Sequence, residues 1–172
     1  MSNDRLYRPN IYYGLAELEA FANPLAPTTT ELNAANGLIF NITCALDEGN
    51  TDFTLGNSDA DSALTFCSVG GSSSPTLYNP SVKFTALLDK DRTATGIFNG
   101  ARDRMAFADE NFYAIERVGK ASDQPFAVGD RVSIIQVKTD LPVWIVGSKT
   151  NAAIQQNFLA NNLTNWGFKL LT

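Results

Sequence analysis

The sequence contains no histidine, so it lacks the side chain that most often acts as a general base or a metal ligand. Ser-His-Asp and Cys-His arrangements are therefore excluded. Cys44 and Cys67 are too few for a four-cysteine zinc site. We expect both to be small buried hydrophobic groups, with a disulfide between neighbouring strands as the alternative. The sequence predicts no catalytic, cofactor-binding or metal-binding residues.

Long hydrophobic runs and phosphate-binding glycine patterns are also missing. No apolar run approaches the roughly 20 residues that cross a bilayer, so no membrane partner is expected. No Walker or dinucleotide-binding motif is present. Residues 1–9 have no apolar signal-peptide core, so we expect the chain to be kept in a cytoplasm or released by lysis. An enzyme that uses two converging carboxylates remains an alternative, and the prediction is that the chain is not an enzyme.

Basic charge is absent from a long part of the chain. Positions 9–82 hold eight carboxylates and no lysine or arginine, and the other residues carry all 13 basic side chains and ten acidic ones. An acidic surface repels nucleic-acid phosphates, and it can attract a basic patch on another copy of the chain. The block therefore disfavours DNA recognition and is compatible with head-to-tail self-assembly. Its members are Glu17, Glu19, Glu31, Asp47, Glu48, Asp52, Asp59 and Asp61.

Hydrophobic alternation predicts seven or eight strands around one principal helix. We expect a single domain over 1–172 that is mainly β, with two packed antiparallel sheets forming a sandwich or barrel-like body. Residues 1–26 are expected to include an edge strand or an N-terminal arm, and residues 46–61 a long acidic loop. The predicted strands cover 38–46, 62–69, 76–88, 112–118, 130–138, 143–146 and the aromatic tail from 153 to 171.

Helical signals occur in two places. Thr28 and Glu31 form a capping-box pattern before a short helix, and Asn36-Gly37 marks its stop or a turn. Residues 94–109 have the period of an amphipathic helix. On that helix we expect one face to hold Ile97, Ala101, Met105 and Ala108, and the opposite face to hold Asn99, Arg102 and Asp103.

Three segments resemble a known family. Residues 27–34 (PTTTELNA) are similar to an early motif of major tail proteins. Residues 89–92 (DKDR), a following helix and residues 112–119 (FYAIERVG) match the middle of such proteins, and residues 128–137 (VGDRVSIIQV) match their end. The chain thus resembles the major tail (tail tube) proteins of long-tailed, siphovirus-type bacteriophages.

This resemblance implies a structural protein of the virion tail that is assembled in the cytoplasm of the host bacterium. It implies two packed sheets with a flanking helix, and hexameric rings that stack into a hollow tube. Viral DNA would pass through the tube without specific binding. It also implies a long loop or hairpin that reaches the next ring, and contacts with other tail proteins at the tube ends.

The acidic positions acquire candidate roles in such a tube. They are expected to line the lumen, to stack rings against basic residues of a neighbouring copy, or to form only a solvated face. Alternatives to a tube protein are a head–tail joining protein, a capsid-decorating protein and a non-viral β-sandwich binding module. That module would use Trp144 and Trp166 as an aromatic platform. The candidate acidic residues are Asp47, Glu48, Asp52, Asp59 and Asp61, and their candidate basic counterparts are Arg102, Arg104 and Lys120.

Overall fold

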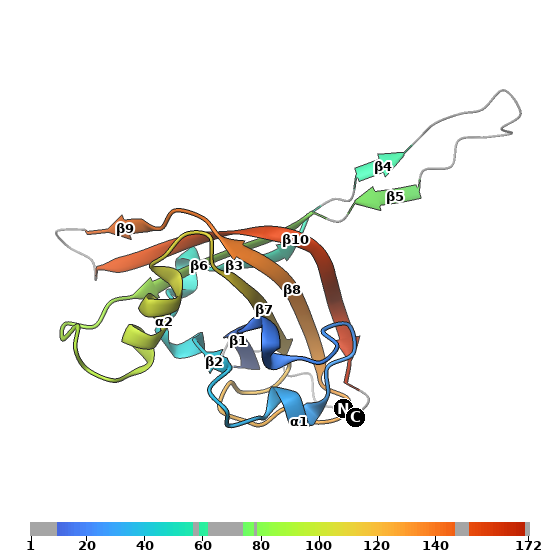
Figure 1. The fold of residues 1–172 in the computed structure, drawn as a ribbon, viewed down its shortest axis with the longest axis horizontal. Helices are drawn as coiled ribbons and strands as arrows, with labels where there is room; N and C mark the ends of the chain where they lie inside the picture. The colour runs from blue at the N-terminus through green and yellow to red at the C-terminus, as the bar shows by residue number, and fades with distance from the viewer. Residues whose placement is uncertain (1–9, 57–58, 62–73, 78, 147–151, 171–172) are drawn as a thin grey trace, which may run out of the picture.

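The fold is built on an eight-stranded antiparallel sheet (Figure 1). The computed structural model describes residues 10–56, 59–61, 74–77, 79–146 and 152–170, and every statement below refers to these residues. The strand order is β2-β1-β7-β8-β10-β6-β3, and β9 pairs with β10 outside this path. The strands are β1 (Ile11–Ala16), β2 (Ile39–Asn41), β3 (Asp52–Leu55), β6 (Pro80–Leu87), β7 (Asn111–Val118), β8 (Arg131–Thr139), β9 (Val143–Ile145) and β10 (Ala153–Lys169).

Strand β10 lies between the two halves of this sheet, β2-β1-β7-β8 and β6-β3. Residues 153–158 pair with β6, and the pairing with β8 runs from Phe158 to Lys169. The register with β8 shifts twice, between Ala160 and Thr164 and again between Asn165 and Phe168. Such irregularities bend a strand and increase its twist, and Figure 1 shows β10 strongly bent. The prediction of two packed sheets is therefore not confirmed, because one long strand links both parts into a single sheet.

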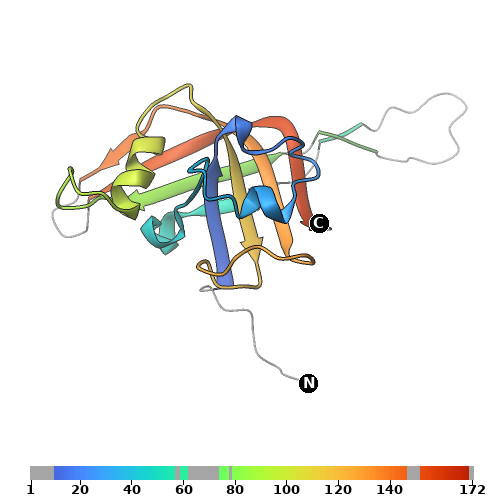
Figure 2. The ribbon, with the colours of Figure 1, turned by 60° about the horizontal axis from the view of Figure 1, so that its bottom comes forward.

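Side chains from the two ends of the sheet meet in one hydrophobic core. Figure 2 shows β6 running across the direction of β1, β7 and β8. The ring of Phe84 on β6 lies 5.7 Å from that of Tyr13 on β1 and 5.4 Å from that of Phe158 on β10. Helix α2 (Ile97–Met105) covers this core with the buried side chains of Ala101 and Met105. The predicted buried face of the helix is confirmed for these two residues.

A second core lies on the opposite face of β1, β7 and β8. Alternate residues of β7 enter the two cores, Phe112 the first and Tyr113 the second. The second core is covered by Phe21 and by Leu32 of α1 (Thr29–Leu32), and a 3-10 helix, η2 (Leu18–Ala20), precedes Phe21. Strands that are buried on both faces have nearly continuous apolar sequences. This explains the strong strand signal in the sequences of β7 and β8.

The predicted helix ends agree with the structure at α1. The Thr28 side chain accepts a hydrogen bond from the backbone N–H of Glu31, and the Glu31 carboxylate accepts one from the backbone N–H of Thr28. The capping box is confirmed. Gly37 has a φ of 77°, so the predicted turn also requires its glycine.

Several expectations about the elements were wrong. Strand β1 is not an edge strand, because β2 and β7 pair on its two sides. Segment 38–46 forms only β2 and is followed by a 3-10 helix, η3 (Thr43–Ala45), whose Cys44 is an exposed free thiol rather than a buried one. Asn99 faces inward, because its side chain donates hydrogen bonds to the carbonyls of Asp91 and Ala94. The predicted strand 62–69, Cys67 and the arm residues 1–9 lie outside the described residues.

Segment 46–61 is not one long loop. It forms a 3-10 helix, η4 (Glu48–Asn50), then β3, and then β4 (Asp59–Asp61). Phe53 on β3 is buried in the first core, where its ring stacks on that of Trp166 with centroids 5.6 Å apart. The burial of Phe53 and the pairing of β3 with β6 hold this acidic segment at the edge of the sheet.

Replacing Phe84 by alanine tests the joined core. We expect Phe84→Ala to lower the free energy of unfolding by about 3–5 kcal/mol, because a fully buried ring that contacts both ends of the sheet leaves a cavity. Leu159→Ala is the control, because that side chain is 56% exposed, and its effect should stay within about 0.5 kcal/mol. Urea denaturation measures both, and similar losses would contradict the description of this core.

Candidate assembly surface

The acidic segment begins with a residue that serves local structure. The Asp47 carboxylate accepts hydrogen bonds from the backbone N–H of Gly49 at 3.1 Å and from the Asn50 side-chain amide at 2.7 Å. These bonds cap η4, as short polar side chains commonly do at helix starts. Asp47 thus stabilises the turn that precedes β3. The next acidic residue, Glu48, is exposed.

Strand β3 places the next carboxylate, that of Asp52, opposite a lysine on the neighbouring strand. Asp52 faces Lys83 in the antiparallel register of β3 and β6. Opposite charges at such cross-strand positions contribute about 0.2–1 kcal/mol. Lys83 is also the first basic residue after the acid-only stretch. The end of the acidic block is therefore partly balanced within the same sheet.

A two-stranded hairpin continues from the pair β3–β6. At its base the backbone N–H of Gly56 donates to the carbonyl oxygen of Asn79 at 2.8 Å. Beyond this point β4 pairs with β5 (Ser74–Leu77) as a separate two-stranded sheet. Figure 1 shows both strands projecting away from the body. Asp59 and Asp61 are therefore positioned on a projecting element, which sequence reasoning had treated as the end of a loop.

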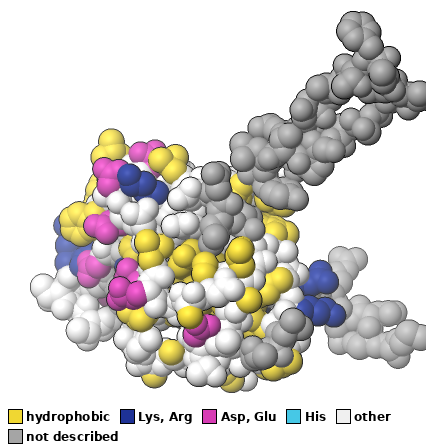
Figure 3. Space-filling view, turned by 45° about the vertical axis from the view of Figure 1, so that its right-hand side comes forward, with side chains coloured by type: hydrophobic (Ala, Val, Ile, Leu, Met, Phe, Trp, Pro, Cys, Tyr) yellow, Lys and Arg dark blue, Asp and Glu magenta, His cyan; other side chains and the backbone are white. Residues whose placement is uncertain are grey.

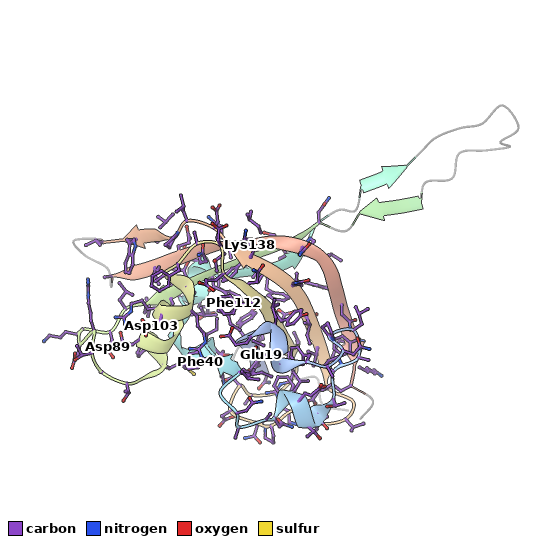
Figure 4. All side chains as sticks on the ribbon, in the orientation of Figure 1. Glu19, Phe40, Asp89, Asp103, Phe112 and Lys138 are labelled. Atoms are coloured by element: carbon purple, nitrogen blue, oxygen red, sulfur yellow. The ribbon has the colours of Figure 1, made fainter. Side chains whose placement is uncertain are left out.

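The other carboxylates of the acid-only stretch lie elsewhere. Glu19 is in η2, on the side of the second core, and Figure 4 shows it well separated from Asp103 on α2. Glu31 is part of the capping box; its burial favours a higher pKa, but hydrogen bonds from Thr28 and Ala22 outweigh it and hold that pKa below the usual value. On the face in Figure 3 the acidic side chains are scattered among neutral and apolar ones. The block is thus divided in space although it is continuous in sequence.

Each of the three candidate basic residues already contacts a group of its own chain. Arg102 donates from Nε and Nη2 to Asp103 Oδ1 at 2.8 and 2.6 Å. The Arg104 guanidinium lies over the ring of Phe40, 4.3 Å from its centroid. Lys120 Nζ donates to the Pro125 carbonyl at 2.9 Å. Arg102 and Arg104 lie on α2 and Lys120 in the loop between β7 and β8, so they do not form one basic surface.

Arg117 is an important residue that sequence reasoning missed. It is completely buried on β7, where its guanidinium donates to the carbonyl oxygens of Gln124 and Ala121 at 2.8 and 2.6 Å. The guanidinium also lies 4.5 Å from the centre of the Phe126 ring and 3.7 Å from Asp130 Oδ2. Burial lowers the pKa of Arg117, and the carboxylate of Asp130 opposes that shift.

The role of Arg117 is to hold the loop between β7 and β8 against the sheet. Its place in the alternation was a usable signal, because Arg117 shares a face of β7 with Tyr113 and Ile115, which are both buried. A charged residue in phase with a buried face needs buried acceptors. Here the loop carbonyls supply them.

Glu116, the neighbour of Arg117 on β7, is directed toward the other face. Burial raises the pKa of its carboxyl to about 7, and a hydrogen bond with the Tyr13 side chain opposes part of that rise. In the unfolded chain the pKa returns to its ordinary value of 4.5. The folded chain therefore holds this proton over a pH range in which the unfolded chain has lost it.

This difference gives a pH dependence of known sign. The stabilisation is fully present below the unfolded pKa of 4.5 and is lost as the pH rises through about 7. We expect the free energy of unfolding to fall by about 1–2 kcal/mol over this window, allowing for screening of a partly buried group. Glu116→Gln should remove most of that slope, and Glu110→Gln, at an exposed position, should keep it. Urea denaturation from pH 4 to pH 8 measures the slope, and an unchanged slope in Glu116→Gln would refute the assignment.

The described residues lack two kinds of feature, a cluster of metal ligands and a helix that could span a membrane. In the described part of the chain, no three histidine, cysteine, aspartate or glutamate side chains come together as a group that could hold a metal ion. Among the helices of the described ranges, none has the length and apolar character needed to cross a membrane. The candidate surfaces of the described residues are the projecting hairpin, the acidic residues before and at the start of β3, and the charged residues of α2.

Comparison with known proteins identifies the family. The chain matches the family model described as phage tail tube protein over residues 10–164, which is most of its 172 residues. No curated protein matches the chain. The matched range includes the capping box, α2, the whole first core and the strands β4 and β5. The chain therefore belongs to the phage tail tube protein family.

Proposed function

We propose that copies of this chain form hexameric rings that stack into the tail tube, the conduit through which viral DNA is ejected into the host. Membership of the tail tube family supports self-assembly into a tube together with other tail proteins. The observation that carries the proposal is the hairpin of β4 and β5. Among the described residues, these strands pair with each other and with no other strand, and they project beyond the body (Figure 1).

Such a projection has a direct use in a stack of rings. Two-stranded hairpins are only marginally stable when they stand alone in water. A second copy in the next ring would cover this one and give its strands a surface to pack against. In the proposal, rings assemble in the host cytoplasm, other tail proteins bind at the tube ends, and DNA passes without base-specific contacts.

The acidic segment has a place in this arrangement. We propose that Glu48, Asp52, Asp59 and Asp61 act where two rings meet. Asp59 and Asp61 lie on β4, and Glu48 and Asp52 lie before and at the start of β3, the strand that leads into the hairpin. Arg102, Arg104 and Lys120 of the next copy would be their counterparts. Asp47 contributes indirectly, through the cap of η4. The second role, repulsion of DNA by acidic groups lining the lumen, makes a different experimental prediction.

Replacing the hairpin tests the stacking role. Gly56 and Asn79 are joined by a backbone hydrogen bond of 2.8 Å, so residues 57–78 can be exchanged for a two-residue Asn-Gly turn. We expect the shortened chain to melt within about 5 °C of the wild type, because the exchange leaves every core residue that the structure describes in place. It should form single rings and no long tubes in sedimentation velocity and negative-stain images. Long tubes of the shortened chain would contradict the stacking role.

Charge neutralisation separates stacking from lumen lining. The test variant is Glu48→Gln with Asp52→Asn. The control is Glu17→Gln with Glu19→Gln, which removes the same charge from another part of the same block. If the test pair contacts basic residues of the next ring, the critical concentration for tubes should rise about twofold to thirtyfold, as the loss of two surface ion pairs per copy would give.

Three results of this comparison are informative. Weaker tube formation in the test variant but not in the control supports stacking. Intact tubes with impaired DNA delivery in phage complementation support lumen lining. Normal assembly and normal delivery in the test variant would show that these carboxylates form only a solvated face.

A further inference from the structure

Residues 141–146 form an uncharged, exposed stretch around β9. Its sequence is LPVWIV. The side chains of Leu141 and Val146 are 74% and 81% exposed, and those of Val143 and Trp144 are both 48% exposed. None of these residues belongs to either hydrophobic core. Successive residues of a strand point to opposite faces, so β9 is exposed on both of its faces.

The backbone of β9 is open on one side as well. In the described part of the chain β9 pairs only with β10, through Val143, Trp144 and Ile145. An edge strand presents unpaired N–H and C=O groups to any strand that approaches, and monomeric proteins usually protect such edges with charged residues. No charged residue lies between positions 141 and 146. The uncharged, apolar composition of this edge is therefore typical of a strand that is buried against another chain.

Other exposed apolar residues do not form a comparable run in the sequence. Leu25, Phe107 and Val128 are each well exposed, but they come from three separate segments of the chain. Single exposed hydrophobic residues are common on protein surfaces, whereas contiguous apolar patches mark interaction sites. The other terminal strand on the side of β6 is β3, and it carries Asp52. The stretch around β9 is thus the one to explain.

The family to which the chain belongs determines the occupant. Tail tube proteins self-assemble, and every copy in a tube must bury surface against other copies. A contact between β9 and β9 of a second copy would be isologous and would end at a dimer. Growth of a ring or tube requires a heterologous contact, in which a patch meets a different surface on the next copy.

We propose that residues 141–146 dock on a different surface of a second copy of this chain, with Trp144 as the central anchor. This proposal rests on the proposed self-assembly and identifies one of the surfaces that assembly uses. Tryptophan residues dominate the energetics of many interfaces because a large ring is removed from water. A half-exposed Trp144 that lies outside both cores is free to make that contribution between copies.

A charge placed on β9 tests this surface. Trp144→Glu should leave the fold intact, because the side chain packs in neither core, and circular dichroism with thermal melting checks this. The critical concentration for assembly should rise at least thirtyfold, as expected for loss of an interface anchor. Val128→Glu is the matched control at a position that is 65% exposed. Unchanged assembly of Trp144→Glu, or equal loss in the control, would overturn the proposal.

Fluorescence of Trp144 gives a second readout that does not depend on a disruptive change. The chain has two tryptophans, so Trp166→Phe leaves Trp144 as the single reporter and retains an aromatic ring beside Phe53. On assembly the emission should shift to shorter wavelength, and quenching by acrylamide should fall at least about twofold as the ring leaves water. Emission and quenching that stay constant while assemblies form would also overturn the proposal.

Failure of this inference is distinguishable from failure of the proposed function. If the wild-type chain stays monomeric at high concentration, self-assembly fails and the docking surface fails with it. If the wild type and Trp144→Glu assemble equally well, the tube function stands and only the role of β9 is wrong. A partner other than a second copy would give this latter result.

Discussion

The structure depends on the double pairing of β10. Its first residues pair with β6 and β9, and the remainder pairs with β8. The other strands of the sheet lie on its two sides: β6 and β3 on one side, and β8, β7 and β1 on the other. Because β10 bends, side chains from the two ends face each other, and Phe84 fills the space between them. A chain of this size can thereby bury two cores without a second sheet packed against the first.

The same arrangement leaves two elements outside the packed body. The hairpin of β4 and β5 extends from the β3–β6 pair, and β9 extends along one side of β10. No residue of β9 belongs to either core, and among the described residues β4 and β5 pair with no strand of the main sheet. A protein that must join many copies of itself needs rigid surfaces of this kind on a stable body. The buried Arg117 adds to that rigidity by fixing the loop between β7 and β8.

Local signals in the sequence predicted local structure well. The capping box of Thr28 and Glu31 and the buried positions 101 and 105 on α2 follow from interactions within a few residues. The sheet was predicted less well because pairing is decided by distant residues. The partners of β10 lie up to 76 positions away, as the register of Phe158 with Val82 shows, and hydrophobic periodicity within a segment carries no information about such distant partners.

The candidate site illustrates the same limit. The acidic residues of 46–61 were recognised, but polar composition alone could not distinguish a loop from an edge strand followed by a hairpin, since Phe53 is the single residue of β3 that is buried. Asn99 was assigned to the wrong face because its side chain has backbone partners in the preceding loop. Both errors arise where one side chain decides the placement of a segment.

The central claim is that this body builds a tube by contacts between copies through the hairpin. The most direct measurement is a cryo-electron microscopy reconstruction of the assembled full-length chain. The account predicts stacked rings in which β4 and β5 of one copy contact a copy in the next ring. Assemblies in which β4 and β5 contact no other copy, or a chain that remains monomeric, would contradict it.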